Sequence, residues 1–568
     1  MRTYTRVISA ATCLGLLLTG CTDEGDGGGD QGAGPTVQPG TSTPDAAMTL
    51  IPDPDPAAAA ISTSRALYDS SQVVVLADPD DPTSLTLGAS AAVALGVPLL
   101  LSMQAEPGQT PPAGGGDALG IELERLGVTS VLAVGGAAAE GVPLIGTDVT
   151  TLAVPTDAAA IAQAVGMDLG AAEPVPVDQF ATAFAALDPA SPVALLPAGE
   201  PASAPSTDSA ETEVMLPRVS RPEAVTGTLV LATSTPESLP GIATARAAGV
   251  AVQVVSPEQL DPRASSETIT ALSHNRPDAV IALGAGYGNQ QGLDWKLATA
   301  ATGTQLPGGG QLLFQQRMFV ALYGYTEGGA LGVLGEQDEN GAVQRAIETA
   351  AEYDDLVSTR VVPMFEIIAT VASEFPGEDG NYSAEASITQ LQPWVDAAGA
   401  AGIYVVLDLQ PGRTDFLTQA QAYEPLLRLP HVGLALDPEW RLLPNQVHLN
   451  QIGFVSIEEV NAVVTWLADL TRNNALPQKM LVLHQFQIGM IPERELLDTS
   501  REELAVLIHV DGNGDPGSKQ ETWVALHRDP PDNIYWGWKN FIDEDAPLLT
   551  PEQTIDQALP TPELITYQ

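Results

Sequence analysis

Carboxyl side chains recur at one kind of position in the C-terminal half of the chain, directly after short apolar runs. Two carboxyl groups flanking a glycosidic bond are the minimum for hydrolysis of a sugar polymer, one acting as acid and one as base or nucleophile. The sequence therefore offers a set of candidate catalytic residues. They are Glu366, Asp408, Asp437, Glu439 and Asp511.

A lysine, a histidine and several aromatic residues lie near the same positions. The chain has only four lysines and six histidines, so their placement here favours a site. A lysine among carboxylates stays charged and can order them, and aromatic rings suit the faces of sugars. The candidate ligand-binding residues are Tyr323, Trp440, His484, Gln485, Trp536 and Lys539. The alternative is that these residues only cap strands, pair with one another or pack in a core.

The sequence gives little support for a metal or a cofactor. The segment 511–515 has the D-x-N-x-D spacing of a calcium loop, but Pro516 replaces the required glycine and Thr522 the bidentate glutamate. The glycines at 135–136 and 284–286 lack the full dinucleotide-binding pattern. We therefore expect no metal and no cofactor.

The apolar runs that precede these residues predict parallel strands, with helices such as 342–356 and 457–470 between them. About eight strand–helix units in about 250 residues are typical of a (β/α)₈ barrel, whose functional groups project from the carboxyl ends of the strands. We therefore predict a TIM-barrel-like domain over 312–568. The expected strands are 318–325, 331–336, 361–366, 403–408, 432–437, 479–484, 504–510 and 533–539.

Residues 58–305 show a second pattern, in which apolar runs alternate with alanine-rich helical segments. The runs 73–77, 97–101 and 130–134 have no polar alternation, which is typical of parallel strands covered on both faces. Similar runs recur at 228–233 and 279–284. We therefore predict a duplicated parallel α/β region, Rossmann- or flavodoxin-like, joined to the barrel by a linker at 306–310 that limited proteolysis should cut.

The first copy resembles the cell wall-binding repeat 2 family of Gram-positive surface proteins. The residues that carry the resemblance are Leu76-Ala77, the run from Ser84 to Ala91, 96–101, and 126–136. The resemblance implies a compact α/β assembly that holds the protein on a wall polysaccharide. Two copies are recognisable here, where the family usually carries three.

The N-terminus is typical of an exported protein. Arg2 and Arg6 precede a short apolar segment, and residues 1–20 are expected to be a cleaved signal peptide. Leu18-Thr19-Gly20-Cys21 resembles the lipobox of bacterial lipoproteins, which implies lipidation of Cys21. Residues 21–57 are rich in Gly, Asp and Pro and are expected to be a disordered tether. The expected location is the outer face of the cytoplasmic membrane, in contact with the cell wall.

The charge balance excludes some partners. With 23 Lys+Arg against 71 Asp+Glu, the chain has a formal net charge of −48. Such a surface repels nucleic acid phosphates, so we expect no nucleic acid partner. The expected partners are wall polysaccharide and, through the lipid, the membrane; the oligomeric state stays open.

Residues 315–560 resemble the barrel-type domain of actinobacterial surface lipoproteins, on the strength of 407–413, 435–440 and 483–486. The likeness to glycoside hydrolases is an analogy at the level of the fold. Two functions remain open at this point. The barrel recognises a wall glycan without cleaving it, or it is a wall-associated glycoside hydrolase that uses paired strand-end carboxylates.

Overall fold

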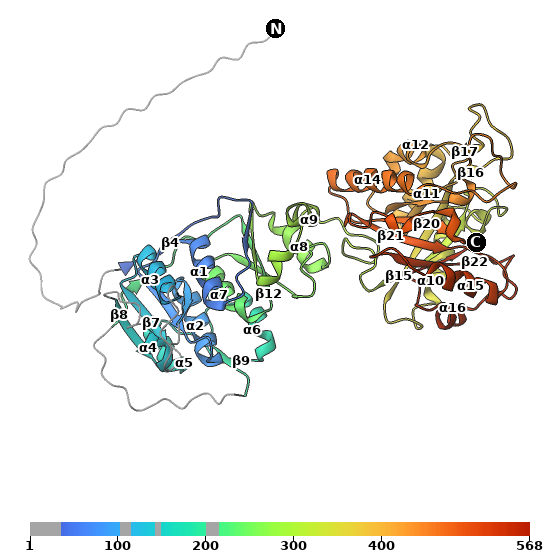
Figure 1. Ribbon diagram of the computed structural model, residues 1–568. Coiled ribbons are helices and arrows are strands. Elements are labelled where there is room, and N and C mark those ends of the chain that lie inside the picture. Colours follow the sequence, from blue (N-terminus) through green and yellow to red (C-terminus); the bar gives the residue numbers. More distant parts are fainter. Residues whose placement is uncertain (1–35, 103–114, 142–148, 200–214) are drawn as a thin grey trace, which may run out of the picture.

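The computed structural model describes residues 36–102, 115–141, 149–199 and 215–568 (Figure 1). The signal peptide, Cys21 and the first part of the expected tether lie outside these ranges. Among the described residues, no helix combines the length and apolar character needed to cross a membrane.

Two four-stranded parallel sheets form the core of the N-terminal half, as the apolar runs predict. In both sheets, the first strand of the strand–helix–strand series lies between the second and the third. The first sheet has the order β6 (Leu99–Leu101), β5 (Val73–Ala77), β7 (Ser130–Val134), β8 (Thr150–Val154), and the second has β13 (Ala251–Val255), β12 (Thr228–Thr233), β14 (Ala279–Leu283), β3 (Met48–Ile51).

Helices between the two sheets join them into one unit. Helix α7 (Leu239–Ala247) contacts both α1 (Pro56–Leu67) and α2 (Pro82–Leu95), and one hydrophobic cluster includes residues of both sheets. Twelve of the fourteen residues of α2 are buried, because a helix that is apolar all round must be covered on every side. A third, smaller parallel pair, β9 (Glu173–Val175) and β10 (Leu195–Pro197), flanks α6 (Phe180–Ala186) and packs on the same helices.

The expectation of a disordered tether fails for residues 36–57. Strand β1 (Thr36–Val37) pairs with β11 (Arg218–Val219), and β2 (Gly40–Thr41) pairs with β4 (Tyr68–Ser70). Strand β3 completes the second sheet by pairing with β14. Each short strand is held by a partner outside residues 36–57. The composition of this segment therefore suggested disorder, because the pairing that orders it is not visible locally.

Eight parallel strands in the C-terminal half close into a barrel, which confirms the prediction (Figure 1). Closure follows because the first strand pairs with both the second and the eighth. Helices such as α10 (Glu339–Ala351), α11 (Ile388–Ala400), α14 (Ile457–Asn473) and α15 (Pro516–Leu526) connect the strands. The strands are β15 (Arg317–Gly324), β16 (Arg360–Ala372), β18 (Tyr404–Leu409), β19 (Val432–Leu436), β20 (Lys479–Gln485), β21 (Leu504–Val510), β22 (Tyr535–Asn540) and β23 (Leu564–Tyr567).

One of the eight expected strands is wrong. The run 331–336 forms a loop and the 3-10 helix η5 (Val333–Glu336), and the missing strand is β23, near the C-terminus. Gly332 has a φ of 115°, and a Cβ there would lie 2.5 Å from the carbonyl oxygen of Tyr323. The segment therefore folds back against the end of β15 and does not enter the barrel wall.

The segment expected to be a linker between the two halves is packed against other residues. Leu306 is 4% exposed and joins Leu313 in the apolar cluster inside the barrel. Gln311 is fully buried, and its side-chain amide donates to the carbonyl oxygens of Thr299 and Thr304. The apolar side chains and the buried amide therefore fasten this segment to both halves.

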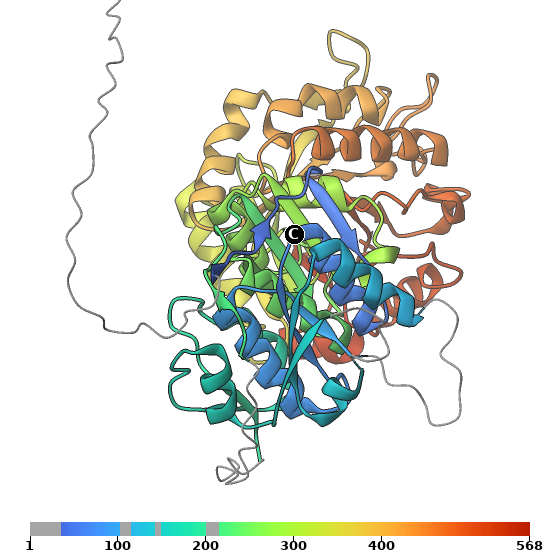
Figure 2. The same ribbon diagram turned by 90° about the vertical axis from the view of Figure 1, so that its left-hand side faces the viewer.

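The second sheet of the N-terminal half, with its helices, lies next to the barrel (Figures 1 and 2). Polar contacts join the two. Lys296 of α9 (Leu293–Ala300) forms an ion pair with Glu502, just before β21. The ring of Trp295 lies 4.4 Å from the guanidinium carbon of Arg263 and 4.8 Å from that of Arg472. The two halves thus share an interface with charged and aromatic groups.

Candidate functional site

Side-chain alternation along the barrel strands divides the interior into two layers. Inward-facing residues near the strand starts are apolar, including Phe319, Met364 and Val406. At the carboxyl ends the interior becomes polar and ionisable. The residues of this end are Tyr323, Glu366, Asp408, Asp437, His484, His509, Asp511, Lys539 and Thr566, and none is more than 9% exposed.

His484 lies at the centre of this group. Its Nδ1 is 2.9 Å from Asp511 Oδ2, and its Nε2 is 2.7 Å from Glu366 Oε1 and 3.8 Å from Asp408 Oδ1. Burial favours the neutral ring, but the carboxylates Glu366 and Asp511 outweigh it and raise the pKa of His484 well above its usual value. The histidine thus links three strands through charged contacts.

The carboxyl groups of the site fall into two classes. Burial would raise the pKa of Glu366 and Asp511, but His484 outweighs it and leaves both below their usual values. Burial raises the pKa of Asp408 to about 6, and that of Asp437 well above its usual value. Burial and the charge of Asp511 raise the pKa of Glu439 to about 7. Neighbouring carboxyl groups pushed to opposite protonation states are what acid–base catalysis requires.

Two predicted ligand-binding residues, Tyr323 and Lys539, pack against each other in the site. The Lys539 Nζ lies 3.5 Å from the centroid of the Tyr323 ring. The Tyr323 hydroxyl donates to Asp408 Oδ2 at 2.9 Å. The charge of Lys539 also favours the ionised forms of Glu366 and Asp511.

The structure does not bring Gln485 and Trp536 into the site. Gln485 follows the inward His484, so its side chain points to the opposite face, where its Oε1 accepts from Arg494 at 3.0 Å. Trp536 stacks on His527, with ring centroids 3.6 Å apart. Trp440 lies at the rim, half-buried, with its ring centroid 5.5 Å from that of His448.

Sequence reasoning missed His509 and Thr566. His509 lies two residues before Asp511 in an otherwise apolar run, so period-two alternation places both on the inner face. Its Nε2 is 3.1 Å from the Thr566 hydroxyl, and burial lowers the pKa of His509 to about 3, which keeps the ring neutral. The alternation in the sequence could have predicted that His509 faces the barrel interior. Its contact with Thr566 of β23 could not be predicted, because it depends on strand pairing.

Four buried atoms of the site have no hydrogen-bond partner among the described residues. They are Glu366 Oε2, Asp408 Oδ1, His509 Nδ1 and Asp511 Oδ1. Buried polar groups are normally satisfied, because each unmade hydrogen bond costs about 1–3 kcal/mol. Their accumulation in one place indicates a site that serves something besides folding.

The segment 511–515 is not arranged as a calcium loop. Asp515 accepts hydrogen bonds from the backbone amides of Gly517 and Ser518 at the start of α15, whereas Asp511 binds His484. The two carboxylates therefore serve different partners.

Comparisons with known proteins leave the family open. No family model and no curated protein matches the chain. Among solved structures, the chain is similar to Cwp6 from Clostridium difficile, with 13% identity and a TM-score of 0.32. The match covers 59% of this chain and 64% of Cwp6, which is less than two thirds of that protein. At such a TM-score the likeness decides neither the fold nor the function, and both rest on the residues described above.

Proposed function

We propose that the barrel is a glycoside hydrolase acting on a cell-wall glycan, within a lipoprotein anchored on the outer face of the membrane. One observation carries the proposal: the carboxyl end of the barrel buries carboxyl, imidazole and ammonium groups together. Four of the carboxylate and imidazole atoms there have no hydrogen-bond partner among the described residues. Burying charges costs stability, and recognition of a neutral glycan does not require it. Catalysis does, so cleavage is favoured over binding alone.

Glu439 and Asp511 lie nearest to solvent among the carboxyl groups of the site. Glu439 is half-buried, and with a pKa of about 7 it carries a proton for much of the time at neutral pH. It suits the role of general acid toward the leaving oxygen. Asp511 is 9% exposed and has one unpaired oxygen, which suits the role of base or nucleophile. Trp440, next to Glu439, is placed to contact a sugar ring.

The N-terminal half supplies attachment in this proposal. Three strands of each sheet share one order, β6-β5-β7 and β13-β12-β14, which supports their origin as duplicated cell wall-binding repeats. The smaller parallel pair β9 and β10 packs on the helices between these sheets. Together they hold the barrel on wall polysaccharide.

The hydrolase proposal is tested by incubating the full-length chain with purified wall fractions and measuring released reducing ends and co-sedimentation together. Glu439→Gln should lower release by about 10²–10⁴-fold, the usual contribution of a general acid, with co-sedimentation intact. The matched control is Glu521→Gln, an exposed position on the outer helix α15. Co-sedimentation without release in the wild-type chain would make the barrel a binding module. Absence of both would overturn the proposed function.

The lipid anchor has its own test. Cys21→Ser should abolish incorporation of labelled acyl chains and move the protein out of the detergent phase, because two or three acyl chains are needed for durable anchoring. A Cys21→Ser protein that stays acylated and membrane-bound would contradict the anchor.

A further inference from the structure

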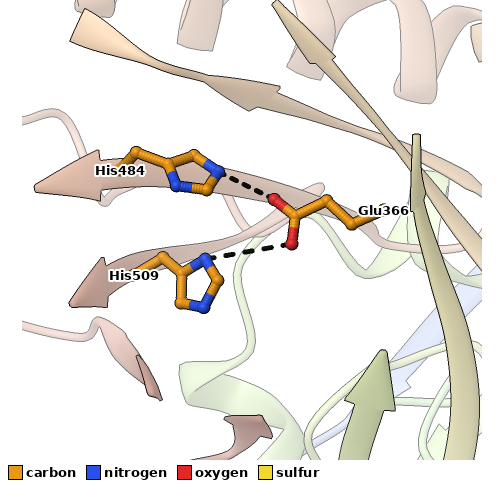
Figure 3. A group of neighbouring side chains, drawn as sticks. All are labelled: Glu366, His484 and His509. Atoms are coloured by element: carbon orange, nitrogen blue, oxygen red, sulfur yellow. Dashed lines mark hydrogen bonds and ion pairs between the residues drawn. The ribbon is translucent and has the colours of Figure 1, made fainter. Parts of the chain in front are cut away.

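Three side chains on three barrel strands point toward one another in the deepest part of the site. Figure 3 shows Glu366 from β16, His484 from β20 and His509 from β21. One ligand atom of each lies within 4.8 Å of the other two. All three residues are 0% exposed. A glycan therefore does not reach them, whereas the space between their polar atoms has the scale of a single ion.

Several of the atoms that face this centre lack hydrogen-bond partners among the described residues. Glu366 Oε2 and His509 Nδ1 are 3.9 Å apart, and neither makes a hydrogen bond within the part of the chain that the structure describes. Asp408 Oδ1, also unpaired by hydrogen bonds, lies 3.8 Å from His484 Nε2. Polar atoms with free lone pairs, fully buried and aimed at one point, are the arrangement that a bound cation satisfies.

Outer hydrogen bonds fix both imidazoles in the orientation that metal ligands need. His484 Nδ1 donates to Asp511 Oδ2 at 2.9 Å, which directs Nε2 toward Glu366. On the other ring, Nε2 lies 3.1 Å from the Thr566 hydroxyl, which directs Nδ1 toward the same carboxylate. A metal-binding histidine almost always uses its second nitrogen in this way, on a carboxylate, a carbonyl or water.

We propose that Glu366, His484 and His509 bind one divalent transition-metal ion, for which zinc is the best match, with Asp408 as an available fourth ligand. Two imidazoles and a carboxylate form a common zinc ligand set. Bonds of about 2.0–2.1 Å place the ligand atoms of a tetrahedral site about 3.3 Å apart. His484 Nε2 lies 2.7 Å from Glu366 Oε1, and His509 Nδ1 lies 3.9 Å from Glu366 Oε2. With one ligand atom from each residue, the three atoms lie within 4.8 Å of one another, so the side chains would have to close around the ion.

The ion takes the place of the proton between His484 Nε2 and Glu366. It also adds positive charge to a centre where carboxylates outnumber cations. Neither point depends on the proposed hydrolysis, so the metal site stands or falls by itself.

The first test measures metal uptake without substrate. The full-length chain, purified in detergent and stripped with a chelator, is dialysed against micromolar Zn²⁺ or Co²⁺, and bound metal is counted by mass spectrometry. About one ion per chain, release of protons on binding, a rise in Tm and the visible absorption of tetrahedral Co²⁺ are expected. A stripped wild-type chain that takes up no metal overturns the proposal, whatever its activity.

Variants locate the ion. Glu366→Gln, which keeps the side-chain shape, and His509→Ala should each weaken binding at least 100-fold, and Asp511→Asn about 10–100-fold through His484. His274→Ala on α8 (Ser266–Asn275), an exposed histidine, is the control and should bind as the wild type does. Binding unchanged in Glu366→Gln and His509→Ala places the ion elsewhere and overturns the assignment. A chain that binds zinc but releases no reducing ends loses the hydrolase function and keeps the metal site.

Discussion

Glu122 in the N-terminal unit and Glu366 in the barrel are both 0% exposed, yet their surroundings differ. Both oxygens of Glu122 accept hydrogen bonds, from Ser64, Arg65 and Arg125. Glu366 has one oxygen bound to His484, and its other oxygen has no hydrogen-bond partner among the residues that the structure describes. A carboxylate buried for stability is satisfied on every side, whereas one buried for a site keeps an atom free for a ligand.

The strand ends of the two halves differ in the same way. In the N-terminal unit, β7 and β14 are followed by Gly135 and Gly284, whose positive φ angles allow tight turns. In the barrel, β19 and β21 are followed by Asp437 and Asp511. Both halves use covered parallel strands, so the difference lies in the residue type at the strand end and not in the architecture.

The largest expected effect is on turnover, and it tests whether Asp437 of the barrel serves the functional site or only the stability of the fold. Asp437→Asn should reduce glycan turnover by about 10²-fold or more, which is about 2.7 kcal/mol of barrier, while Tm stays the same or rises. Stability is expected to hold because burial already disfavours the ionised form of Asp437, and Asn preserves acceptance from the Glu439 amide. Turnover and melting are measured on the same samples, with the surface variant Asp396→Asn as control. Loss of stability without loss of turnover would make Asp437 scaffold.

The next effect is on stability and concerns Glu122, the buried carboxylate whose oxygens both accept hydrogen bonds. Glu122→Gln should lower the free energy of unfolding by about 2 kcal/mol, because it weakens charge-assisted hydrogen bonds to two partly exposed arginines. The pKa of Glu122 is lowered in the fold, so its contribution is present above the unfolded pKa of about 4.3 and is lost as pH falls. Glu124→Gln, exposed on the same helix α3 (Gly115–Leu126), should change little in denaturant titrations. Equal effects of the two substitutions would break the comparison.

A smaller effect concerns the pH dependence of turnover. Glu439 faces the charges of Asp511, Lys539 and His484, and burial with Asp511 raises its pKa to about 7. As a general acid it must be protonated, so kcat/KM should fall about tenfold per pH unit above that value. The descending limb should be missing in Glu439→Gln, measured over the same range. A wild-type profile that stays flat to pH 9 contradicts this role of Glu439.

The sequence by itself determined most of the barrel strands and where the ionisable groups lie along them, although it placed one strand at 331–336 and missed β23. The runs 73–77 and 131–134 are apolar at every position, which is the pattern of a strand covered on both faces. In a parallel barrel all strands end on one side, so residues that follow such runs must meet there. Glu366, Asp408, Asp437 and His484 were found in this way.

Only the tertiary structure decided which strands are partners and what each side chain contacts. Strand β3 depends on β14, and β23 on β15 and β22, at distances along the chain that no local pattern encodes. Pairing positioned His509 between Glu366 and Thr566 and left Trp536 on the outer face against His527. The residue type at a position and the alternation of side chains along a strand are local properties of the chain. Whether a buried polar atom finds a hydrogen-bond partner depends on all the neighbouring strands together.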